Sequence, residues 1–255
     1  MVFPQLHTFF EHAGRLATFA GKFFAQVWRR PFEGRELICQ LDETGTKSLV
    51  LVLVTGCAIG IVLSMQSRGT LARFGAEAVL PSMLALSVIK EIGPVITSLV
   101  LAGRLGAGIA AELGSMRVTE QIDALEVAAL QPFRYLVVTR VLACIVMFPL
   151  MTIACDIVAL GGGYIEASLS SDLDYRLFAD QAFSSLRLSD LLFSTSKTAV
   201  FGFIVGLTSC SLGYNVRGGT REVGQAAMQA VVVSSLLVLL ADVLMVRIDL
   251  ILFGS

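Results

Sequence analysis

Five long apolar segments constrain the fold of this chain more than any other feature of its sequence. A helix needs about 20 predominantly apolar residues to cross a bilayer, and segments of this kind occupy residues 48–65, 79–102, 136–165, 191–212 and 230–252. Hydrophobic residues make up 55% of the chain and charged residues 15%, against about 25% charged in an ordinary soluble domain. The sequence therefore predicts an all-α integral membrane protein with one domain, residues 1–255, and little chain for a separate soluble catalytic domain.

Residues 1–35 form a different kind of segment, which is apolar but periodic. Hydrophobic side chains recur at helical spacing from Phe3 to Val27, and most charged side chains fall off this stripe; Trp28 and residues 29–31 close it. Such a stripe predicts a helix that lies in the membrane interface. A signal peptide is the alternative, but no basic start is followed by an uninterrupted apolar core.

Basic residues are distributed unevenly between the two sides of the predicted bundle. Eleven lysines and arginines lie on one side and four on the other. Because basic loops stay in the cytoplasm, the side with eleven is predicted to be cytoplasmic, and the acidic loop 168–190 to face outward. The eleven are Arg15, Lys22, Arg29, Arg30, Arg35, Lys47, Arg117, Arg134, Arg140, Arg217 and Arg221, and the four are Arg68, Arg73, Arg176 and Arg187.

Charged residues also occur inside the predicted spans; Arg247 and Asp249 lie in the second half of the fifth, and those that most need explaining are Lys90, Glu91, Asp156, Lys197 and Asp242. Each costs about 2.5–3.5 kcal/mol at the bilayer centre, so these side chains need partners or a watery cavity. Lys90 and Glu91 point about 100° apart on an α-helix, so we expect that they cannot both face one neighbour. Glu91 is expected to pair with a basic residue of another span, for which Lys197 is one candidate, and Lys90 with Asp242 or a negative head group. Two roles stay open: ion pairs that fix helix packing, or a cavity for an amphipathic or anionic substrate.

Small residues and one proline mark where the spans are expected to pack or bend. GxxxG pairs let helix backbones approach closely, within one chain or across a dimer. A proline weakens the helix, and backbone groups exposed at that depth must be satisfied by protein or by water in a cavity. The residues predicted in this way are Gly56, Gly60, Pro94, Gly106, Gly202 and Gly206.

Several kinds of chemistry are disfavoured by the motifs that the sequence lacks. The five cysteines form no CxxC pair, and His7 and His12 do not have the i, i+4 spacing of a metal pair, so we expect no metal site and no catalytic residue. A net charge of −1 offers no basic field for nucleic acid. The GxGxxA match at residues 106–111 follows no strand, and no GxxxxGK[ST] loop occurs, so any ATP must be bound by another chain.

The loop over residues 112–140 differs from the other loops in its composition. Apolar Met116, Ile122 and Leu125 are interspersed with acidic residues at 120, 123 and 126. This pattern predicts a short amphipathic helix on the cytoplasmic side, suited to docking into a groove on a partner. An ordinary interfacial connector is the alternative reading.

The stretch KEIGPVITSLVLAGRLGAGIAAELGSMRVTEQIDAL, residues 90–125, resembles the signature of the MlaE/YrbE family. Members of that family are permease subunits of ABC transporters that work with MCE proteins in lipid trafficking. The resemblance covers nearly the whole chain in weaker form. Two positions depart from the family pattern: residues 128–132 stand where a Gly-Val-Asp-Pro-like turn is usual, and Thr139 precedes Arg140 where proline is common.

The resemblance implies an assembly and a role for particular residues. It implies a homodimer in the bacterial inner membrane, each copy having an interfacial helix and five spans, with ATP and Mg²⁺ on partner ATPase subunits, an MCE-protein ring on the periplasmic side and, in some members, a STAS-type protein. The segment 113–134 resembles the helix that seats on the ATPase, and the coupling residues expected here are Glu112, Met116, Thr119, Glu120, Gln121, Asp123 and Leu125. The residues expected to shape or gate the substrate cavity are Lys90, Glu91, Arg104, Lys197 and Asp242, of which Lys90 or Arg104 would meet a phosphate.

We therefore expect a permease subunit that converts the ATP-driven motion of a partner into movement of a phospholipid. A proton-coupled secondary transporter is the alternative, with Glu91 and Asp242 as proton carriers, although no inverted repeat is detectable. An intramembrane enzyme would need a nucleophile or metal set that neither the cysteines nor the histidines supply.

Overall fold

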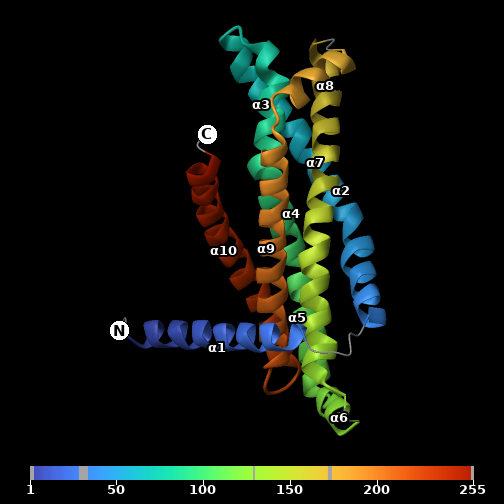
Figure 1. The fold of residues 1–255 in the computed structure, drawn as a ribbon, viewed down its shortest axis with the longest axis vertical. Helices are drawn as coiled ribbons and strands as arrows, with labels where there is room; N and C mark the ends of the chain where they lie inside the picture. The colour runs from blue at the N-terminus through green and yellow to red at the C-terminus, as the bar shows by residue number, and fades with distance from the viewer. Residues whose placement is uncertain (1–2, 29–33, 129, 172–173, 254–255) are drawn as a thin grey trace. The chain divides into compact units, whose positions relative to one another are not determined.

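The computed structural model describes residues 3–28, 34–128, 130–171 and 174–253, and every regular element in these ranges is a helix (Figure 1). Five helical stretches are long and apolar enough to cross a membrane, and each predicted span falls on one of them. The prediction of an all-α integral membrane protein is confirmed. The stretches are Gly34–Arg73, Glu77–Val118, Phe133–Ser170, Leu188–Tyr214 and Thr220–Ile251.

Some of these stretches are divided by tighter or wider helical turns. η1 is a 3-10 turn, whereas η2, η3 and η4 are π turns. In chain order the elements are α1 (Phe3–Val27), α2 (Gly34–Arg73), η1 (Glu77–Val79), α3 (Leu80–Ser87), η2 (Val88–Ile92), α4 (Gly93–Leu101), η3 (Ala102–Gly106), α5 (Ala107–Val118), α6 (Gln121–Val127), η4 (Phe133–Val138), α7 (Thr139–Ser171), α8 (Tyr175–Ser184), α9 (Leu188–Tyr214) and α10 (Thr220–Phe253).

The chain divides by its internal contacts into two compact units, each with packing of its own. The first unit comprises Met1–Thr44, Ala102–Ile145 and Gly202–Leu237. The second unit comprises Gly45–Leu101, Val146–Phe201 and Val238–Ser255.

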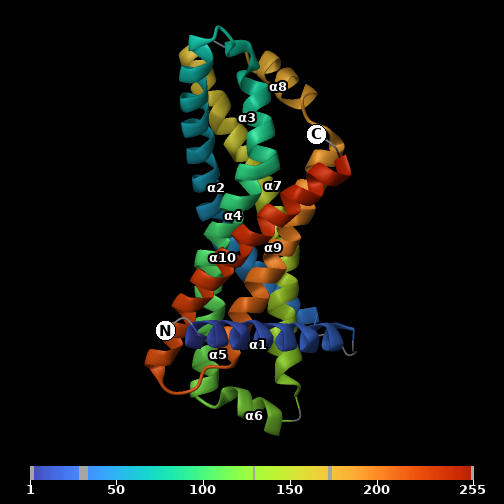
Figure 2. The same ribbon diagram turned by 90° about the vertical axis from the view of Figure 1, so that its left-hand side faces the viewer.

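In the first unit, α1 is held by aromatic side chains. The ring of Phe19 is buried, and its centroid lies 4.9 Å from that of Phe133 and 6.3 Å from that of Tyr214. α1 runs crosswise to α5 (Figures 1 and 2), and Phe24 near its C-terminal end and Trp28, directly after it, are exposed. The helix expected within residues 1–35 is present; residues 29–31 lie outside the described ranges, and the place of α1 in the membrane interface stays a prediction.

The first unit also contains two of the predicted packing glycines with close neighbours. A Cβ atom added at Gly206 of α9 would lie 3.2 Å from Val141 and Cys144 of α7. One added at Gly106 of η3 would lie 3.3 Å from the hydroxyl oxygen of Ser209. Both glycines therefore serve contacts within this chain. Gly202, at the edge of the unit, is buried.

In the second unit, α3, α7 and α8 enclose a hydrophobic core that includes Leu84, Val88 and Phe178. α2 packs closely on α7 through Gly56 and Gly60. A Cβ atom at Gly60 would lie 1.8 Å from the carbonyl oxygen of Ala159, and one at Gly56 would lie 2.8 Å from the carbonyl oxygen of Cys155. The GxxxG pair of α2 thus lets two backbones of the same chain meet.

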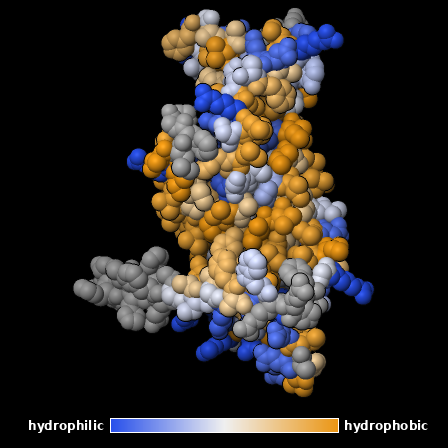
Figure 3. All heavy atoms as spheres, in the orientation of Figure 1, coloured by the Kyte–Doolittle hydropathy of each residue, from blue (hydrophilic) through white to orange (hydrophobic). Residues whose placement is uncertain are grey.

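The long helices also expose many large hydrophobic side chains. Hydrophobic residues dominate the surface of the long helices in the face that Figure 3 shows. On α10 the exposed side chains include Val232, Leu236, Leu240 and Leu244. This surface matches helices whose outer faces meet lipid.

Candidate functional site

The π turn η2 in the second span is bound to α9 through its own backbone. In a π turn the carbonyls accept from N–H groups five residues later, so the carbonyl of Ile89 would accept from residue 94. That residue is Pro94, which has no N–H. The hydroxyl of Ser194 on α9 donates to the carbonyl of Ile89 instead. The buried Pro94 therefore leaves a bonding position that a neighbouring helix fills.

Lys197 of α9 is the centre of an intramembrane charge cluster. Its Nζ atom lies 2.9 Å from Oε2 of Glu91 on η2 and 3.1 Å from Oδ1 of Asp242 on α10. The lysine side chain is 2% exposed, whereas that of Glu91 is 44% exposed. The predicted pairing of Glu91 with Lys197 is confirmed. The predicted pairing of Lys90 with Asp242 is wrong, because Lys90 binds Asp190 and Asp242 binds Lys197.

Lys90 binds α9 as well, at a second position. Its Nζ atom lies 3.0 Å from Oδ1 of Asp190. The expectation that Lys90 and Glu91 cannot both face one neighbour is therefore wrong. Asp190 and Lys197 are seven residues apart on α9, about 10.5 Å along the helix, and the two long side chains of the π turn reach one position each. Asp190 was predicted to lie in the outward loop 168–190, and its seven-residue spacing from Lys197 is the sequence signal that places the two on α9.

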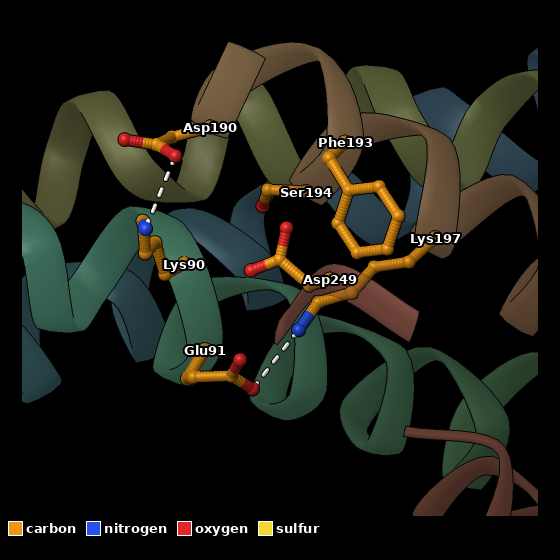
Figure 4. A pocket seen from close by; sticks show the side chains of 7 residues that line it. All are labelled: Lys90, Glu91, Asp190, Phe193, Ser194, Lys197 and Asp249. Atoms are coloured by element: carbon orange, nitrogen blue, oxygen red, sulfur yellow. Dashed lines mark hydrogen bonds and ion pairs between the residues drawn. The ribbon is translucent and has the colours of Figure 1, made fainter. Parts of the chain in front are cut away.

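Four of these charged residues, but not Asp242, line a small pocket of the second unit (Figure 4). Its volume is about 10 Å³, room for roughly one water molecule. Both lysines are bound to carboxylates in this arrangement, so a phosphate would have to displace one of them. The helices must therefore move before the pocket can admit anything larger than a water molecule. The lining residues are Lys90, Glu91, Asp190, Phe193, Ser194, Lys197 and Asp249.

Two other charged residues singled out in the sequence, Arg104 and Asp156, do not line this pocket. Arg104, expected to meet a phosphate, lies on the π turn η3 in the first unit. Asp156 of α7 is 8% exposed, and its Oδ1 atom has no hydrogen-bond partner among the described residues. That atom lies against Gly93, where an added Cβ would approach it to 1.8 Å. Asp156 is therefore a tightly packed group of the α4–α7 contact.

The coupling segment begins with a strained turn between α5 and α6. Glu120 precedes α6 with φ of 59°, and no other non-glycine residue in the described ranges has a positive φ. Such a conformation costs about 1–2 kcal/mol in a residue with a Cβ atom. The turn is held by the hydroxyl of Thr119, which donates to the carbonyl of Ser115, and by an ion pair of 2.6 Å between Arg117 and Asp123.

The surface of the coupling segment differs from the predicted apolar patch. Ile122 is fully buried inside the first unit, so it anchors α6 and cannot contact a partner. Met116 and Leu125 are half-buried, while Val127, at 89%, is the most exposed apolar side chain of α6. The residues of the predicted coupling set that are exposed are Glu112, Thr119, Glu120, Gln121 and Asp123.

Glu112 has a partner that the sequence analysis did not predict. Its Oε1 atom lies 2.7 Å from Nη2 of Arg140 at the start of α7. Arg140 was assigned only to the cytoplasmic charge count. This carboxylate is therefore engaged within the chain.

The described residues contain no cluster of three or more histidine, cysteine or acidic side chains that could hold a metal ion. Their five cysteines are free. The side chains of His7 and His12 lie outside the part of the chain whose side chains are described.

Comparison with known proteins identifies the family. Residues 37–248 match the family described as permease MlaE. A probable ABC transporter permease protein of Rickettsia felis is 37% identical over 92% of this chain and 91% of its own length. One of Synechocystis is 33% identical over 87% of this chain and 84% of its own. The chloroplastic protein trigalactosyldiacylglycerol 1 of Arabidopsis thaliana is 34% identical over 88% of this chain and 64% of its own. With its five membrane-spanning helices, the chain belongs to the MlaE permease family and is a multi-pass permease subunit of an ABC transporter.

Proposed function

We propose that this permease moves phospholipids between a bacterial inner membrane and a conduit of MCE proteins that leads toward or from the outer membrane. A separate ATPase that binds ATP and Mg²⁺ drives the movement, and two copies of the chain form the pathway, with a STAS-type protein on the ATPase in some complexes. Support comes from the family and from the name of the Arabidopsis relative, which contains that of a galactolipid.

One observation carries the proposal: the position of Lys197 between carboxylates of two other helical elements. Its 2.9 Å and 3.1 Å contacts with Glu91 and Asp242 hold η2, α9 and α10 together where the spans are apolar. Opening such a site requires the ammonium to exchange one anion for another. A phospholipid phosphate is a suitable replacement, because lysine binds phosphate as a point charge without fixed geometry. Lys90, Glu91, Lys197 and Asp242 then gate the cavity, and Arg104 is a further cation for the head group.

The exposed residues of the coupling segment contact the ATPase and are displaced when it moves. Glu120, Gln121 and Asp123 present polar side chains around the strained turn, with Thr119 beside them. Strain that persists at one exposed turn is typical of functional sites. Met116 and Leu125 support the segment from its half-buried side. Motion of α5 is passed along one continuous helical stretch, Glu77–Val118, which includes η2 and its charges.

The test is a reconstituted complex of the chain with its ATPase and MCE protein. Co-purified proteins and lipids are identified by mass spectrometry, and transfer of a labelled phospholipid between liposomes and the MCE protein is followed with and without ATP. We expect ATP-dependent transfer that is lost when Lys90 and Lys197 are both replaced by alanine and retained when both are replaced by arginine. Intact transfer by the double alanine variant would remove the gating role.

The same assay separates the alternative of a proton-coupled transporter. That reading needs Glu91 and Asp242 to exchange protons, but both carboxylates share the ammonium of Lys197. Transport by the chain without its ATPase, driven by a proton gradient, would overturn the proposal in favour of the alternative.

A further inference from the structure

Arg140 is a buried charge at the root of the coupling segment. It is the second residue of α7 and is 3% exposed. Its guanidinium donates from Nη1 to the carbonyl oxygen of Leu136 at 2.9 Å and from Nη2 to Oε1 of Glu112 at 2.7 Å. A charge so poorly solvated needs an anion beside it, and Glu112 supplies that anion.

This ion pair joins the helices that precede and follow the coupling segment. Glu112 lies on α5, which enters the coupling segment, and Arg140 lies on α7, which leaves it; the two are 28 positions apart. The bond to Leu136 also includes the π turn η4, which joins the coupling segment to α7. The guanidinium of Arg140 therefore connects α5, which precedes the coupling segment, with η4 and α7, which follow it.

Other contacts make the segment itself stiff beyond this point. Ile122 is fully buried, and Arg117 binds Asp123 across the turn between α5 and α6. The hydroxyl of Tyr135 on η4 donates to Glu36 of α2 at 2.9 Å. A push on α6 therefore reaches the place where α5 and α7 meet, and the Glu112–Arg140 pair decides whether these helices respond together or spread apart.

We propose that Glu112 and Arg140 form a strut that makes α5 and α7 move as one body when the ATPase pushes on α6. Glu112 is then a positioning residue that acts through Arg140, rather than a docking contact for the ATPase. The proposal rests on the coupling role given to residues 113–134 above, but not on the identity of the cargo. Without this ion pair, the ATPase still binds and hydrolyses ATP, but its movement of α6 separates α5 from α7 and is not transmitted to the rest of the permease.

The test uses the complex with its ATPase and a readout of coupling that is independent of the cargo. Deuterium uptake of peptides covering η2 is compared between nucleotide-free and vanadate-trapped complexes. We expect a nucleotide-dependent difference in the unaltered complex. In Glu112→Gln, a near-isosteric change, we expect this difference to fall by about twofold to thirtyfold, with ATPase binding and hydrolysis retained. Glu222→Gln is the matched control, because it is the same change at a glutamate of the first unit outside the coupling segment, where, among the described residues, the carboxylate accepts only an exposed bond from the N–H of Gly219, and it should keep the difference.

The reversed pair, Glu112→Arg with Arg140→Glu, should recover the difference, because it restores opposite charges at the two positions. If Glu112→Gln does not fold, the reversed pair decides: folded protein without the nucleotide-dependent difference overturns the strut. Loss of ATPase binding in Glu112→Gln would identify Glu112 as a docking contact and would overturn the proposal. An unchanged nucleotide-dependent difference in that variant would also overturn it. So would the lack of any nucleotide-dependent difference in the unaltered complex. A normal difference without lipid transfer would refute the lipid proposal and leave the strut standing.

Discussion

Replacement of Gly60 by alanine tests the closest helix contact in the second unit. The added Cβ would lie 1.8, 2.6 and 2.9 Å from the carbonyl oxygen, carbonyl carbon and Cα of Ala159. All three are backbone atoms of α7, so no side chain can rotate away. Real Cβ contacts essentially never fall below 3.0 Å, and the nearest distance is 1.2 Å short of that limit (3.0 minus 1.8). The helices α2 and α7 must separate locally to admit the methyl group.

Gly69→Ala is a matched control on the same helix. Apart from the backbone of its own helix and its two chain neighbours, no heavy atom of the described residues lies within 4 Å of its added Cβ. Both substitutions raise helix propensity by about 0.5–1 kcal/mol, and this gain cancels when the two variants are compared. The remaining difference is the cost of overpacking, about 1–3 kcal/mol. We therefore expect Gly69→Ala to be slightly more stable than the unaltered chain and Gly60→Ala to be less stable.

The measurement is reversible unfolding of the purified chain in detergent, with the free energy of unfolding compared among the three proteins. Thermal midpoints from the same preparations give an independent ranking. Equal stability of Gly60→Ala and Gly69→Ala would refute the reasoning, because it would mean that the backbones of α2 and α7 do not meet at Gly60 and Ala159.

Three further substitutions test other parts of the structure. Lys197→Met leaves two carboxylates without their shared cation and should lower the free energy of unfolding by about 1.5–3 kcal/mol, whereas Lys197→Arg should lose much less; equal losses would contradict the ion-pair reading. Glu120→Gly relieves the left-handed conformation and should raise thermal stability by about 1 kcal/mol, while weakening ATPase binding in a pull-down; unchanged binding would remove Glu120 from the docking surface. Gly93→Ala should destabilise the chain through its 1.8 Å approach to Asp156 Oδ1, and Asp156→Ala in the same chain should relieve that clash; additive losses in a double-mutant cycle would show that the two residues do not meet.

Much of the charge cluster could be predicted from the position of its residues inside the apolar segments of the sequence. A lysine and an acidic residue inside apolar spans must pair with each other or contact water. The pairing of Glu91 with Lys197 could therefore be predicted correctly. The same reasoning paired Lys90 wrongly because it assumed α-helical geometry at residues 88–92. A π turn has no clear sequence signature, and Pro94 indicated only a weak point in the helix.

The ends of the helices were less predictable than their apolar centres. The first predicted span, 48–65, is the centre of a 40-residue helix, Gly34–Arg73. Hydropathy identifies only the part that lipid requires to be apolar. Beyond it the helix is held by polar contacts, such as Gln40 with Glu36 at 2.9 Å, which a sliding average of hydrophobicity does not register.

The coupling segment shows a different limit. Its short helix and exposed acidic residues followed from the pattern of residues 112–126, but the apolar face was assigned to a partner. Ile122 instead packs inside its own chain. A seven-residue helix carries too little periodicity to distinguish an apolar face that meets a partner from one that meets its own unit. Only the tertiary contacts decide between them.

The two kinds of helix contact in the second unit indicate which of its helices can move most easily. α2 and α7 meet backbone to backbone at Gly60, so any separation loses close packing at once. α10 is bound to α9 through the ends of two side chains, Lys197 and Asp242, which can part and re-form without deforming a backbone. In its most apolar stretch only 11% of α10 is buried, against 50% for Leu188–Tyr214. Low burial makes local movement easier. We therefore expect nucleotide-dependent changes in deuterium uptake to be larger in α10 than at the α2–α7 contact; the reverse order would mean that the glycine contact, and not the charge cluster, is the moving joint.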